Sequence, residues 1–564
     1  MNKIIKAIFA VLVILSFCID FLAAQDADAT ATNATDFFQI QTALDLASSN
    51  QRQDVINIGK GTISLEGLQQ HFWYAPPRRP KRDMEEHYPL IINGAGPDKT
   101  IIDGAGGSIF TIMTGNMSDD FGANITISNI CFKNVTDLTG SALGIGTKKA
   151  SIRIENCKFI NCKGNRGSGL AAMAGGENSG TVFVSKCVID SCMGAILLNS
   201  NSSAKIEKCE FTNNTTYPVL ELSGLYGALQ VLDNTFINNS TTQSAPVQCL
   251  ILGSGEIDVE KNTFSGNSGH SSGALDVAAV NSEIDILRNE FTGNDGTDSG
   301  AAHIASNGKG TVTVFRNVFT GNRSINYGGA ANIYSGVDLN TETDRKSNII
   351  VKSCLFAHNR SAFGSSLHIR SDMGSTDIHN CTFAMDSVFR KNAGVVSMCL
   401  CNNVASANLL NNLFFGNVTK NGSNWSHNTK EVVINNDCSD LRSKDPSDNI
   451  GAQVNFSHNI IHNDSVLIEN TVSRKKTLNV DPMLDDSFRL TANSPGIDAG
   501  TTAAHGKIDE GKDCAGNDRS IDGDNDGIPV VDIGAYEYVP HRAFLDKIRD
   551  KSYFVLGHEK KKNK

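Results

Sequence analysis

Short runs in which hydrophobic and polar residues alternate recur through the middle of the chain. Three clear copies are residues 257–259, 284–286 and 312–314, which lead to Phe264, Phe291 and Phe319 in turn. Alternation with a period of two predicts a β-strand that buries one face. Because the same order of strand, Phe and Asn returns each time, the pattern predicts a structural repeat rather than several unrelated globular domains.

One Phe residue, or an Ile in its place, marks the register of each copy. Most intervals between marks are 22 to 31 residues, and two are 37 and 47. The marks are Phe132, Phe159, Ile189, Phe211, Phe236, Phe264, Phe291, Phe319, Phe356, Phe383, Phe414 and Ile461.

A second strand follows a Gly-Ala step in several copies, as in residues 273–277, 300–304 and 329–333. No helical stretch lies between the strands of these copies, so the repeat does not predict βαβ units. Stacked coils would pair each strand with its copies about 4.8 Å away and bury a continuous column of Ile, Val and Leu. We therefore expect an all-β fold, a parallel β-helix solenoid of about a dozen coils.

Two further columns would run beside the marks. The residue two before the mark is Asn or Cys in nearly every copy, and the residue three after it is usually Asn, with Cys162 and Cys192 as exceptions. Equivalent side chains stack in a solenoid, so amides can bond along the axis as a ladder. We expect most cysteines to be buried small hydrophobic residues, because their spacing does not match the Cys pairs of zinc sites.

The N-terminus has the order of a secretory signal peptide, with Lys3 and Lys6, an apolar run from Ile8 to Phe17, and small residues after it. Asp20 makes the run too short to span a bilayer, although an N-terminal membrane anchor is the alternative. We expect residues 1–24 to be removed and the mature chain, without a transmembrane domain, to be extracellular or at the cell surface. The net charge of −10 argues against a nucleic-acid partner.

Residues 25–104 are expected to form an N-terminal cap and the first coils, starting with a short amphipathic helix that contains Phe38, Ala43 and Leu44. This helix, followed by strand-like segments at 54–59 and 88–96, resembles the start of the pectin-lyase-like superfamily. The resemblance covers residues 36–465 as an architecture. It implies a right-handed parallel β-helix, with the repeats at 105–465, in a superfamily that includes many polysaccharide lyases and hydrolases.

Two narrower resemblances concern the repeat and the C-terminal region. The repeat, as in residues 264–267 and 328–330, resembles the Phe-x-x-Asn and Gly-Gly-Ala motifs of the polymorphic outer-membrane proteins, which are bacterial surface adhesins. Residues 494–500 and 532–537 are similar to a terminal module of secreted bacterial β-helix proteins, named choice-of-anchor Q. This implies a C-terminal cap or anchor-like module at residues 466–538, followed by a basic tail at 539–564.

An acidic turn lies within that module. Asp522, Asp524 and Asp526 alternate before Gly527, and Asp532 follows. Carboxylates at alternate positions before a glycine can converge on Ca²⁺, as in the first half of an EF-hand loop, but the Glu expected at the twelfth position is missing. We expect no required cofactor, and we treat these four aspartates as candidate ligands of a structural Ca²⁺, with a solvated acidic turn as the alternative.

The Gly-Ala strands predict an outward polar column. β-Elimination of a polyuronate needs a base for the C5 proton and a cation for the carboxylate. A His, Tyr or Arg of this column could be the base, and Arg370 could be the partner of the carboxylate; the alternative is that outward solenoid positions are merely polar. The candidate catalytic residues are His303, Tyr334, His368 and Arg370, and the candidate ligand-binding residues are Asp276 and Asn332.

Two insertions are candidate ligand loops. Residues 69–87 carry Trp73, Tyr74, Arg78 and Arg79, which could hold an acidic glycan by stacking and charge. Residues 418–453 interrupt the last repeat and contain Trp425. Variable loops are the alternative for both.

Two functions stay open. The first is a secreted or cell-surface protein, adhesin-like and without catalysis, that binds an extracellular glycan or another surface along its solenoid face. The second is a polysaccharide lyase or glycoside hydrolase acting on an acidic polysaccharide. The repeat favours the first function, and the superfamily resemblance permits the second.

Overall fold

The structure is a computed structural model, and it describes residues 31–540 except 69, 76–87, 115–121, 138–139, 165–166, 176–179, 202, 337–346, 373, 391–392, 402–404, 422–423, 428–429, 436–452, 463–465, 469–471 and 503–510. The predicted signal peptide, Arg78, Arg79 and nearly all of the basic tail lie outside the described residues. The chain divides into two compact units. One comprises residues up to His270 together with Leu275–Ala279, and the other comprises Ser271–Ala274 together with the residues from Val280 onward.

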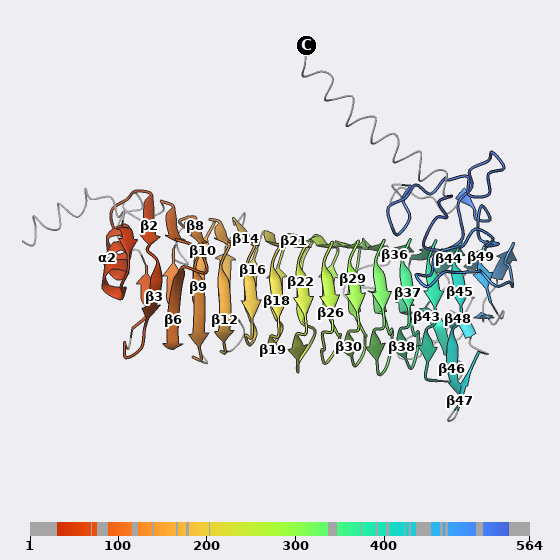
Figure 1. The fold of residues 1–564 in the computed structure, drawn as a ribbon, viewed down its shortest axis with the longest axis horizontal. Helices are drawn as coiled ribbons and strands as arrows, with labels where there is room; N and C mark the ends of the chain where they lie inside the picture. The colour runs from red at the N-terminus through yellow and green to blue at the C-terminus, as the bar shows by residue number, and fades with distance from the viewer. Residues whose placement is uncertain are drawn as a thin grey trace, which may run out of the picture. The chain divides into compact units, whose positions relative to one another are not determined.

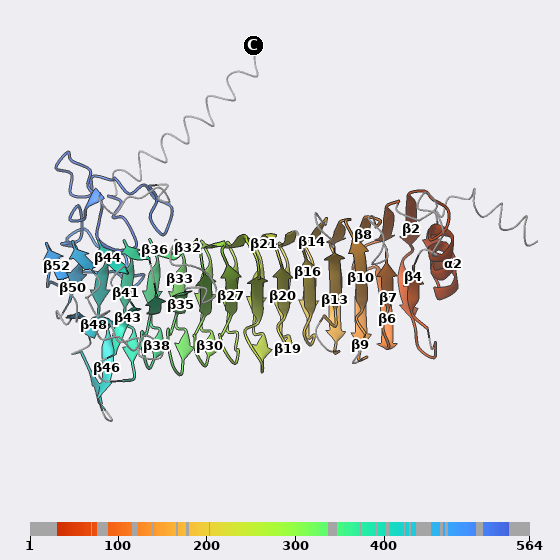
Figure 2. The same ribbon diagram turned by 180° about the vertical axis from the view of Figure 1, so that it is seen from behind.

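Each unit is a stack of coils that contribute strands to three parallel sheets (Figure 1, Figure 2). The first sheet holds the alternating strands that precede each mark, the second sheet holds the marks, and the third sheet holds the strands after the Gly-Ala step. This is the predicted all-β parallel β-helix.

The first unit contains strands of all three sheets and one short extra pair. Its first sheet is β1 (Ala31–Ala34), β2 (Asp54–Ile58), β5 (Leu90–Gly94), β8 (Ile125–Ser128), β11 (Ile152–Glu155), β14 (Thr181–Ser185), β17 (Ser203–Glu207), β21 (Gly227–Leu232) and β25 (Gly255–Glu260). Its second sheet is β3 (Gly61–Ser64), β6 (Thr100–Gly106), β9 (Cys131–Val135), β12 (Lys158–Cys162), β15 (Val188–Asp190), β18 (Glu210–Thr212), β22 (Thr235–Ile237) and β26 (Thr263–Ser265). Its third sheet is β4 (Phe72–Tyr74), β7 (Phe110–Met113), β10 (Leu143–Lys148), β13 (Leu170–Gly175), β16 (Ile196–Ser200), β20 (Leu220–Gly224), β24 (Val247–Ile251) and β27 (Leu275–Val280), and the extra pair is β19 (Thr215–Thr216) with β23 (Ser240–Thr241).

The second unit repeats this order and adds a short fourth sheet. Its first sheet is β28 (Glu283–Leu287), β32 (Gly310–Phe315), β36 (Ser347–Lys352), β40 (Ser375–His379), β44 (Ser406–Leu410), β49 (Gln453–Ser457) and β52 (Val472–Lys475). Its second sheet is β29 (Glu290–Thr292), β33 (Val318–Thr320), β37 (Leu355–Ala357), β41 (Thr382–Ala384), β45 (Leu413–Phe415) and β50 (Ile460–Ile461), and its third is β31 (Ala302–Asn307), β35 (Ala331–Gly336), β39 (Leu367–Ser371), β43 (Gly394–Leu400), β48 (Lys430–Asn435) and β51 (Val466–Ile468). The fourth sheet is β30 (Asp295–Gly296), β34 (Arg323–Ser324), β38 (Arg360–Ser361), β42 (Ser387–Val388), β46 (Val418–Asn421) and β47 (Asn424–Ser426), with β46 and β47 forming an antiparallel hairpin.

The marks form the centre of the hydrophobic core, as the repeat predicted. Their rings stack along the coils, with centroids 4.6 Å apart for Phe211 and Phe236 in the first unit and 4.7 Å apart for Phe291 and Phe319 in the second. All twelve marks are fully buried. Stacked rings at this separation bury large apolar areas and fix the register of each coil.

The predicted amide ladders are present on both sides of this stack. Three residues after the mark, the Asn322 side-chain amide donates to Asn359 Oδ1 at 3.1 Å and to the Phe291 carbonyl at 2.9 Å. Two residues before the mark, the Asn234 amide donates to Asn262 Oδ1 at 3.0 Å. Cysteines at these positions, such as Cys162, are buried free thiols, as expected.

The N-terminal helix α2 (Phe37–Ala47) covers the start of the first unit. Asp36 caps it by accepting the N–H of Gln39 at 2.9 Å. Its buried face includes Phe37, which stacks on Phe72 with ring centroids 4.9 Å apart. The predicted helix is confirmed. Its buried face differs from the prediction in one residue, because Phe37 is buried and Phe38 is 71% exposed.

The C-terminal segment 478–538 packs against the outward face of the second sheet in the second unit. Ala535 packs with Leu355 in one hydrophobic cluster, and Ile533 packs with Leu413 in another. These outward positions are apolar here, whereas Glu290 and other outward positions of the same sheet are polar. The segment therefore lies along the side of the coils.

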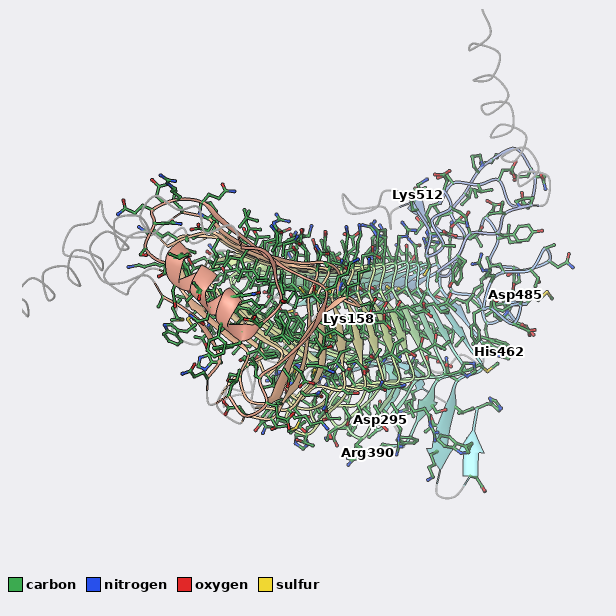
Figure 3. All side chains as sticks on the ribbon, turned by 60° about the vertical axis from the view of Figure 1, so that its left-hand side comes forward. Lys158, Asp295, Arg390, His462, Asp485 and Lys512 are labelled. Carbon is green, nitrogen blue, oxygen red and sulfur yellow. The ribbon has the colours of Figure 1, made fainter. Side chains whose placement is uncertain are left out.

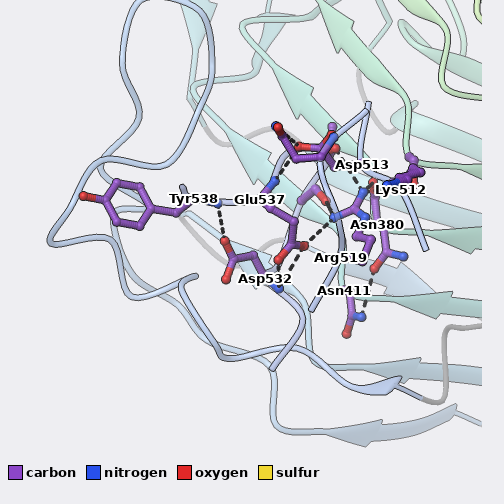
Figure 4. A network of polar contacts seen from close by, with 12 residues as sticks. Asn380, Asn411, Lys512, Asp513, Arg519, Asp532, Glu537 and Tyr538 are labelled. Carbon is purple, nitrogen blue, oxygen red and sulfur yellow. Dashed lines mark hydrogen bonds and ion pairs between the residues drawn. The ribbon is translucent and has the colours of Figure 1, made fainter. Parts of the chain in front are cut away.

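A buried ion pair fixes this segment (Figure 4). The Arg519 guanidinium is fully buried and donates to Glu537 Oε1 at 3.0 Å and to the Ala535 carbonyl at 3.0 Å. It also reaches the coils, where it donates to Ser353 Oγ at 2.9 Å and to the Asn380 carbonyl at 3.4 Å. A buried guanidinium needs such a set of acceptors, because its charge cannot be neutralised by loss of a proton.

Candidate functional site

The predicted outward column is present in the third sheet of the second unit. Parallel pairing places His303 beside Asn332 and Asn332 beside His368, and it places Tyr334 beside Arg370. All five side chains are half-buried, on strands whose intervening residues face the core. The register is as predicted, and the chemical roles stay predictions. Asp276 lies on β27 of the first unit, beside Gln248.

Asp372, which the sequence analysis did not identify, joins two side chains of this column. The Tyr334 hydroxyl donates to Asp372 Oδ2 at 3.0 Å, and Arg370 Nε donates to Asp372 Oδ1 at 3.2 Å. Burial, and then the Asp372 carboxylate, raise the pKa of Tyr334 to about 12. The charge of Arg370 is therefore balanced within the protein. Asp372 follows the end of β39, outside the alternating run, so no register argument pointed to it.

His368 is packed against an aromatic ring. Its imidazole lies with its centroid 4.7 Å from that of Tyr327. Burial, and then the charge of Arg370, lower the pKa of His368 to about 4. Its Nδ1 has no hydrogen-bond partner within the described part of the chain. An imidazole with so low a pKa is neutral near pH 7 but is a weak general base there.

The candidate loop at residues 69–87 is described only in part. Trp73 is half-exposed on β4, and its backbone N–H donates to Gln41 Oε1 at 3.0 Å. Tyr74 is the next residue of the strand, so it points into the core and is 1% exposed. The prediction that both rings stack on a ligand is therefore corrected for Tyr74. Arg78 and Arg79 lie outside the described residues.

The acidic turn brings carboxylates together, but not the predicted four. Carboxylate oxygens of Asp498, Asp522 and Asp524 lie within 4.8 Å of one another. The Asp526 and Asp532 carboxylates are not part of this cluster, and Asp532 is fully buried, where it accepts the backbone N–H groups of Asp498 and Tyr538. Asp498 therefore takes the place predicted for Asp532. It comes from a separate turn, so the spacing of the acidic run could not indicate it. Binding of Ca²⁺ stays a prediction.

A cluster of aromatic and arginine side chains that the repeat pattern did not predict lies beside the fourth sheet of the second unit. Rings pair within it: the centroids of Tyr327 and Phe363 are 5.7 Å apart. Tyr327 and Trp425 are 39% and 44% exposed. We call this surface the aromatic–arginine face, and it consists of Tyr327, Phe363, Phe389, Trp425, Arg360 and Arg390.

The two arginines lie over the rings of this face. The Arg390 guanidinium carbon is 4.8 Å from the centroid of Phe363, and that of Arg360 is 5.2 Å from Phe389 and 5.9 Å from Trp425. Arg390 lies on the side of the second unit from which the β46–β47 hairpin projects (Figure 3). Among the described residues, neither arginine has a carboxylate within 4.0 Å. The described residues therefore leave both guanidinium charges without an acidic partner.

Only one residue of the aromatic–arginine face, Trp425, was predicted from the sequence as part of a ligand site. Tyr327, Phe363 and Phe389 follow their marks by different numbers of residues. They therefore form no column when the repeats are aligned. The parallel pairing of the fourth sheet brings them together, and only Trp425 lies in an insertion that was predicted as a ligand loop.

Comparisons with known proteins agree with the architecture. The family model described as "Right handed beta helix region" matches residues 173–344. No curated protein matches the chain. No helix within the described ranges is long and apolar enough to cross a bilayer. The matched segment begins in β13 and ends just after β35, so it lies within the stacked coils, and together with the parallel sheets it identifies the fold as a right-handed parallel β-helix.

Proposed function

We propose that this protein is an extracellular, adhesin-like β-helix protein that binds an acidic glycan through the aromatic–arginine face. The observation that carries the proposal is the exposure of Trp425 and Tyr327 next to two arginines that have no carboxylate partner among the described residues. The signal-peptide pattern and the resemblances to surface adhesins and to a choice-of-anchor module support the extracellular location.

The chemistry of the face suits a charged sugar chain. The apolar side of a sugar ring can stack on an exposed aromatic ring, and a guanidinium can hold a carboxylate or sulfate by two parallel hydrogen bonds. Arg360 and Arg390 are already oriented by the rings beneath them, so little side-chain entropy is lost on binding. The fourth sheet places these groups on successive coils, which suits an extended ligand with repeated units.

A lyase is the second candidate, and the outward column supports it. His368 Nδ1 and Arg370 Nη2 have no hydrogen-bond partners within the described residues, and they lie in the same strand. Unpaired polar atoms of this kind can indicate a site completed by substrate. However, Arg370 is paired with Asp372, and the pKa of His368 is about 4. Binding without catalysis is therefore the better-supported function.

A binding panel tests the proposal. We expect the mature protein to bind heparin or polygalacturonate and not a neutral glucan, measured by calorimetry or on a glycan array. Trp425→Ala and the pair Arg360→Ala/Arg390→Ala should each weaken this binding at least about tenfold, which corresponds to about 1.4 kcal/mol of binding free energy in total. Tyr226→Ala is the matched control, because Tyr226 is 59% exposed but lies in the first unit. Equal loss in that control, or no binding to any acidic glycan, would contradict the proposal.

A further inference from the structure

Two buried carboxyl groups lie in the amide ladder beneath the aromatic–arginine face. The ladder three residues after the marks contains Asn in most coils, but the mark Phe383 is followed by Asp386. Asp386 is fully buried, and its Oδ1 accepts the backbone N–H of Asn359 at 2.6 Å. It therefore occupies the ladder position of an asparagine, with an oxygen where the ladder has an amide nitrogen.

The ladder geometry shows what this second oxygen faces. In a regular coil such as that of Asn322, the side-chain NH₂ donates both to a Phe carbonyl of one neighbouring coil and to the next ladder oxygen. For Asp386 the equivalent partners are the carbonyl oxygen of Phe356 and the side-chain oxygen of Asn417. Both are acceptors, so an ionised Asp386 carboxylate would face other oxygen atoms. A protonated carboxyl can donate instead. Ser366, which stands where other coils have Ala301 or Ala330, donates its hydroxyl to Asp386 Oδ2.

Glu431 is the second buried carboxyl group. It precedes the paired core residue Val432 of β48, its side chain is buried, and its Oε2 accepts from the Asn417 amide at 2.8 Å. Asn417 is the next ladder residue after Asp386, and it accepts the Asp386 backbone N–H at 2.8 Å. Asp386, Asn417 and Glu431 thus form one continuous buried chain of contacts.

No cation compensates these carboxyls within the described part of the chain. Besides burial, only hydrogen bonds from Ser366 and Asn359 change the pKa of Asp386, and both lower it. For Glu431, the hydrogen bond from Asn417 lowers the pKa and the charge of Asp386 raises it. Burial is the main cause that raises the pKa of Asp386 to about 7 and that of Glu431 to about 8, and their mutual repulsion adds to the shift of Glu431.

This chain of contacts holds the base of the aromatic–arginine face. Asn417 immediately precedes β46, and Glu431 lies at the start of β48, so their hydrogen bond closes the segment that carries Trp425. Asp386 immediately precedes β42, which leads to Phe389 and Arg390. Loosening of these contacts would displace ligand-binding groups on two coils.

We propose that Asp386 and Glu431 are a buried carboxyl pair whose ionisation loosens the aromatic–arginine face, so that ligand binding weakens as the pH rises. The effect on the ligand rests on the proposed function, but the effect on the face does not. Both folded-state pKa values are raised above those of the unfolded chain, so the stabilisation is complete at low pH and is lost as the pH rises through about 7 to 8.

Trp425 can report the loosening without any ligand. The chain has two tryptophans, so Trp73→Phe leaves Trp425 as the single tryptophan fluorophore. We expect its emission to shift to the red between about pH 6 and pH 9, and heparin affinity to fall at least about tenfold over the same range. In the same background, Asp386→Asn restores the amide ladder and Glu431→Gln keeps the acceptor for Asn417. Each change should reduce the pH dependence of both profiles, and the double variant should abolish it, while all other titrating groups stay unchanged.

The outcomes separate the two proposals. A Trp425 emission that titrates in the protein with both acids and is flat in the double variant Asp386→Asn/Glu431→Gln supports the carboxyl pair. It does so even if no glycan binds, a result that would sink only the proposed function. Glycan binding combined with identical pH profiles in the parent and in both variants would overturn the carboxyl pair and leave the proposed function standing. If a variant fails to fold, a pH-independent Trp425 signal in the parent protein is by itself sufficient to overturn the inference.

Discussion

At the scale of single residues, the polar side chains inside the coils are held by partners from the neighbouring coils. Asn322 shows the pattern: its amide bonds to Phe291 and Asn359, and its Oδ1 accepts the backbone N–H of Asn294 at 3.0 Å. Each ladder residue therefore satisfies backbone groups that a turn would leave unpaired in the core. The same demand explains why an acid in the ladder, Asp386, is accompanied by Ser366 as a donor.

Removal of one ladder amide should be costly. We expect Asn322→Ala to lower the free energy of unfolding of the second unit by about 3 kcal/mol, because several buried groups lose their partners at once. Asn326→Ala is the control, since the Asn326 amide makes an exposed hydrogen bond to Asp298, and its loss should cost less than about 1 kcal/mol. Urea unfolding followed by circular dichroism measures both. Equal effects of the two changes would show that the ladder contributes little to stability.

At the scale of elements, the strands that carry the marks and the alternating runs could be predicted from the sequence, because burial repeats there with a fixed period. The fourth sheet could not, since its strands are two to four residues long, which is too short to show a period of alternating burial. Asp372 and Asp498 were missed for the same reason, because turns bring them to their partners. The sequence does indicate that another segment docks on the second sheet. Outward positions of the second sheet become apolar at Leu355 and Leu413, which indicates that something covers them.

Docking of that segment depends on Arg519. We expect Arg519→Met to destabilise the segment by about 3–5 kcal/mol, since Glu537 would remain buried without its partner. Limited proteolysis should then release fragments of residues 478–538 while the coils stay intact. Lys512→Met is the control, because the ion pair of Lys512 with Asp518 is exposed and contributes less than about 1 kcal/mol. Full protease resistance of the Arg519 variant would show that apolar contacts alone hold the segment.

The acidic turn in the same segment gives a metal-removal test. If Asp498, Asp522 and Asp524 bind Ca²⁺, an ion at a hundredfold excess over its Kd should stabilise the segment by about 2.7 kcal/mol. A chelator should then lower the melting temperature of the segment, and Asp524→Asn should abolish the difference. Asp295→Asn, in the fourth sheet, should keep it. Identical melting curves with and without chelator would leave the turn as a solvated acidic loop.

At the scale of the whole molecule, the right-handed β-helix fold is compatible with both binding and catalysis, so the fold does not decide the function. The decision depends on what the outward side chains leave available to a ligand. On the aromatic–arginine face, two guanidiniums have no carboxylate partner among the described residues, whereas in the third sheet Arg370 is paired with Asp372. The charges that a ligand can use therefore lie beside the fourth sheet rather than over the predicted catalytic column.

This distribution of charge predicts that the outward column of the third sheet does not cleave acidic polysaccharides by elimination. Elimination needs an unpaired cation near the uronate carboxylate and a base matched to the working pH. Arg370 Nε lies 3.2 Å from Asp372 Oδ1, and the Tyr334 hydroxyl donates a hydrogen bond to Asp372 Oδ2, so neither group is free for the reaction. We expect no unsaturated product from polygalacturonate or alginate, followed by ultraviolet absorbance. Product formation that disappears in both Tyr334→Phe and Arg370→Ala, but persists in Trp425→Ala, would instead establish a lyase, because only the first two changes alter the outward column.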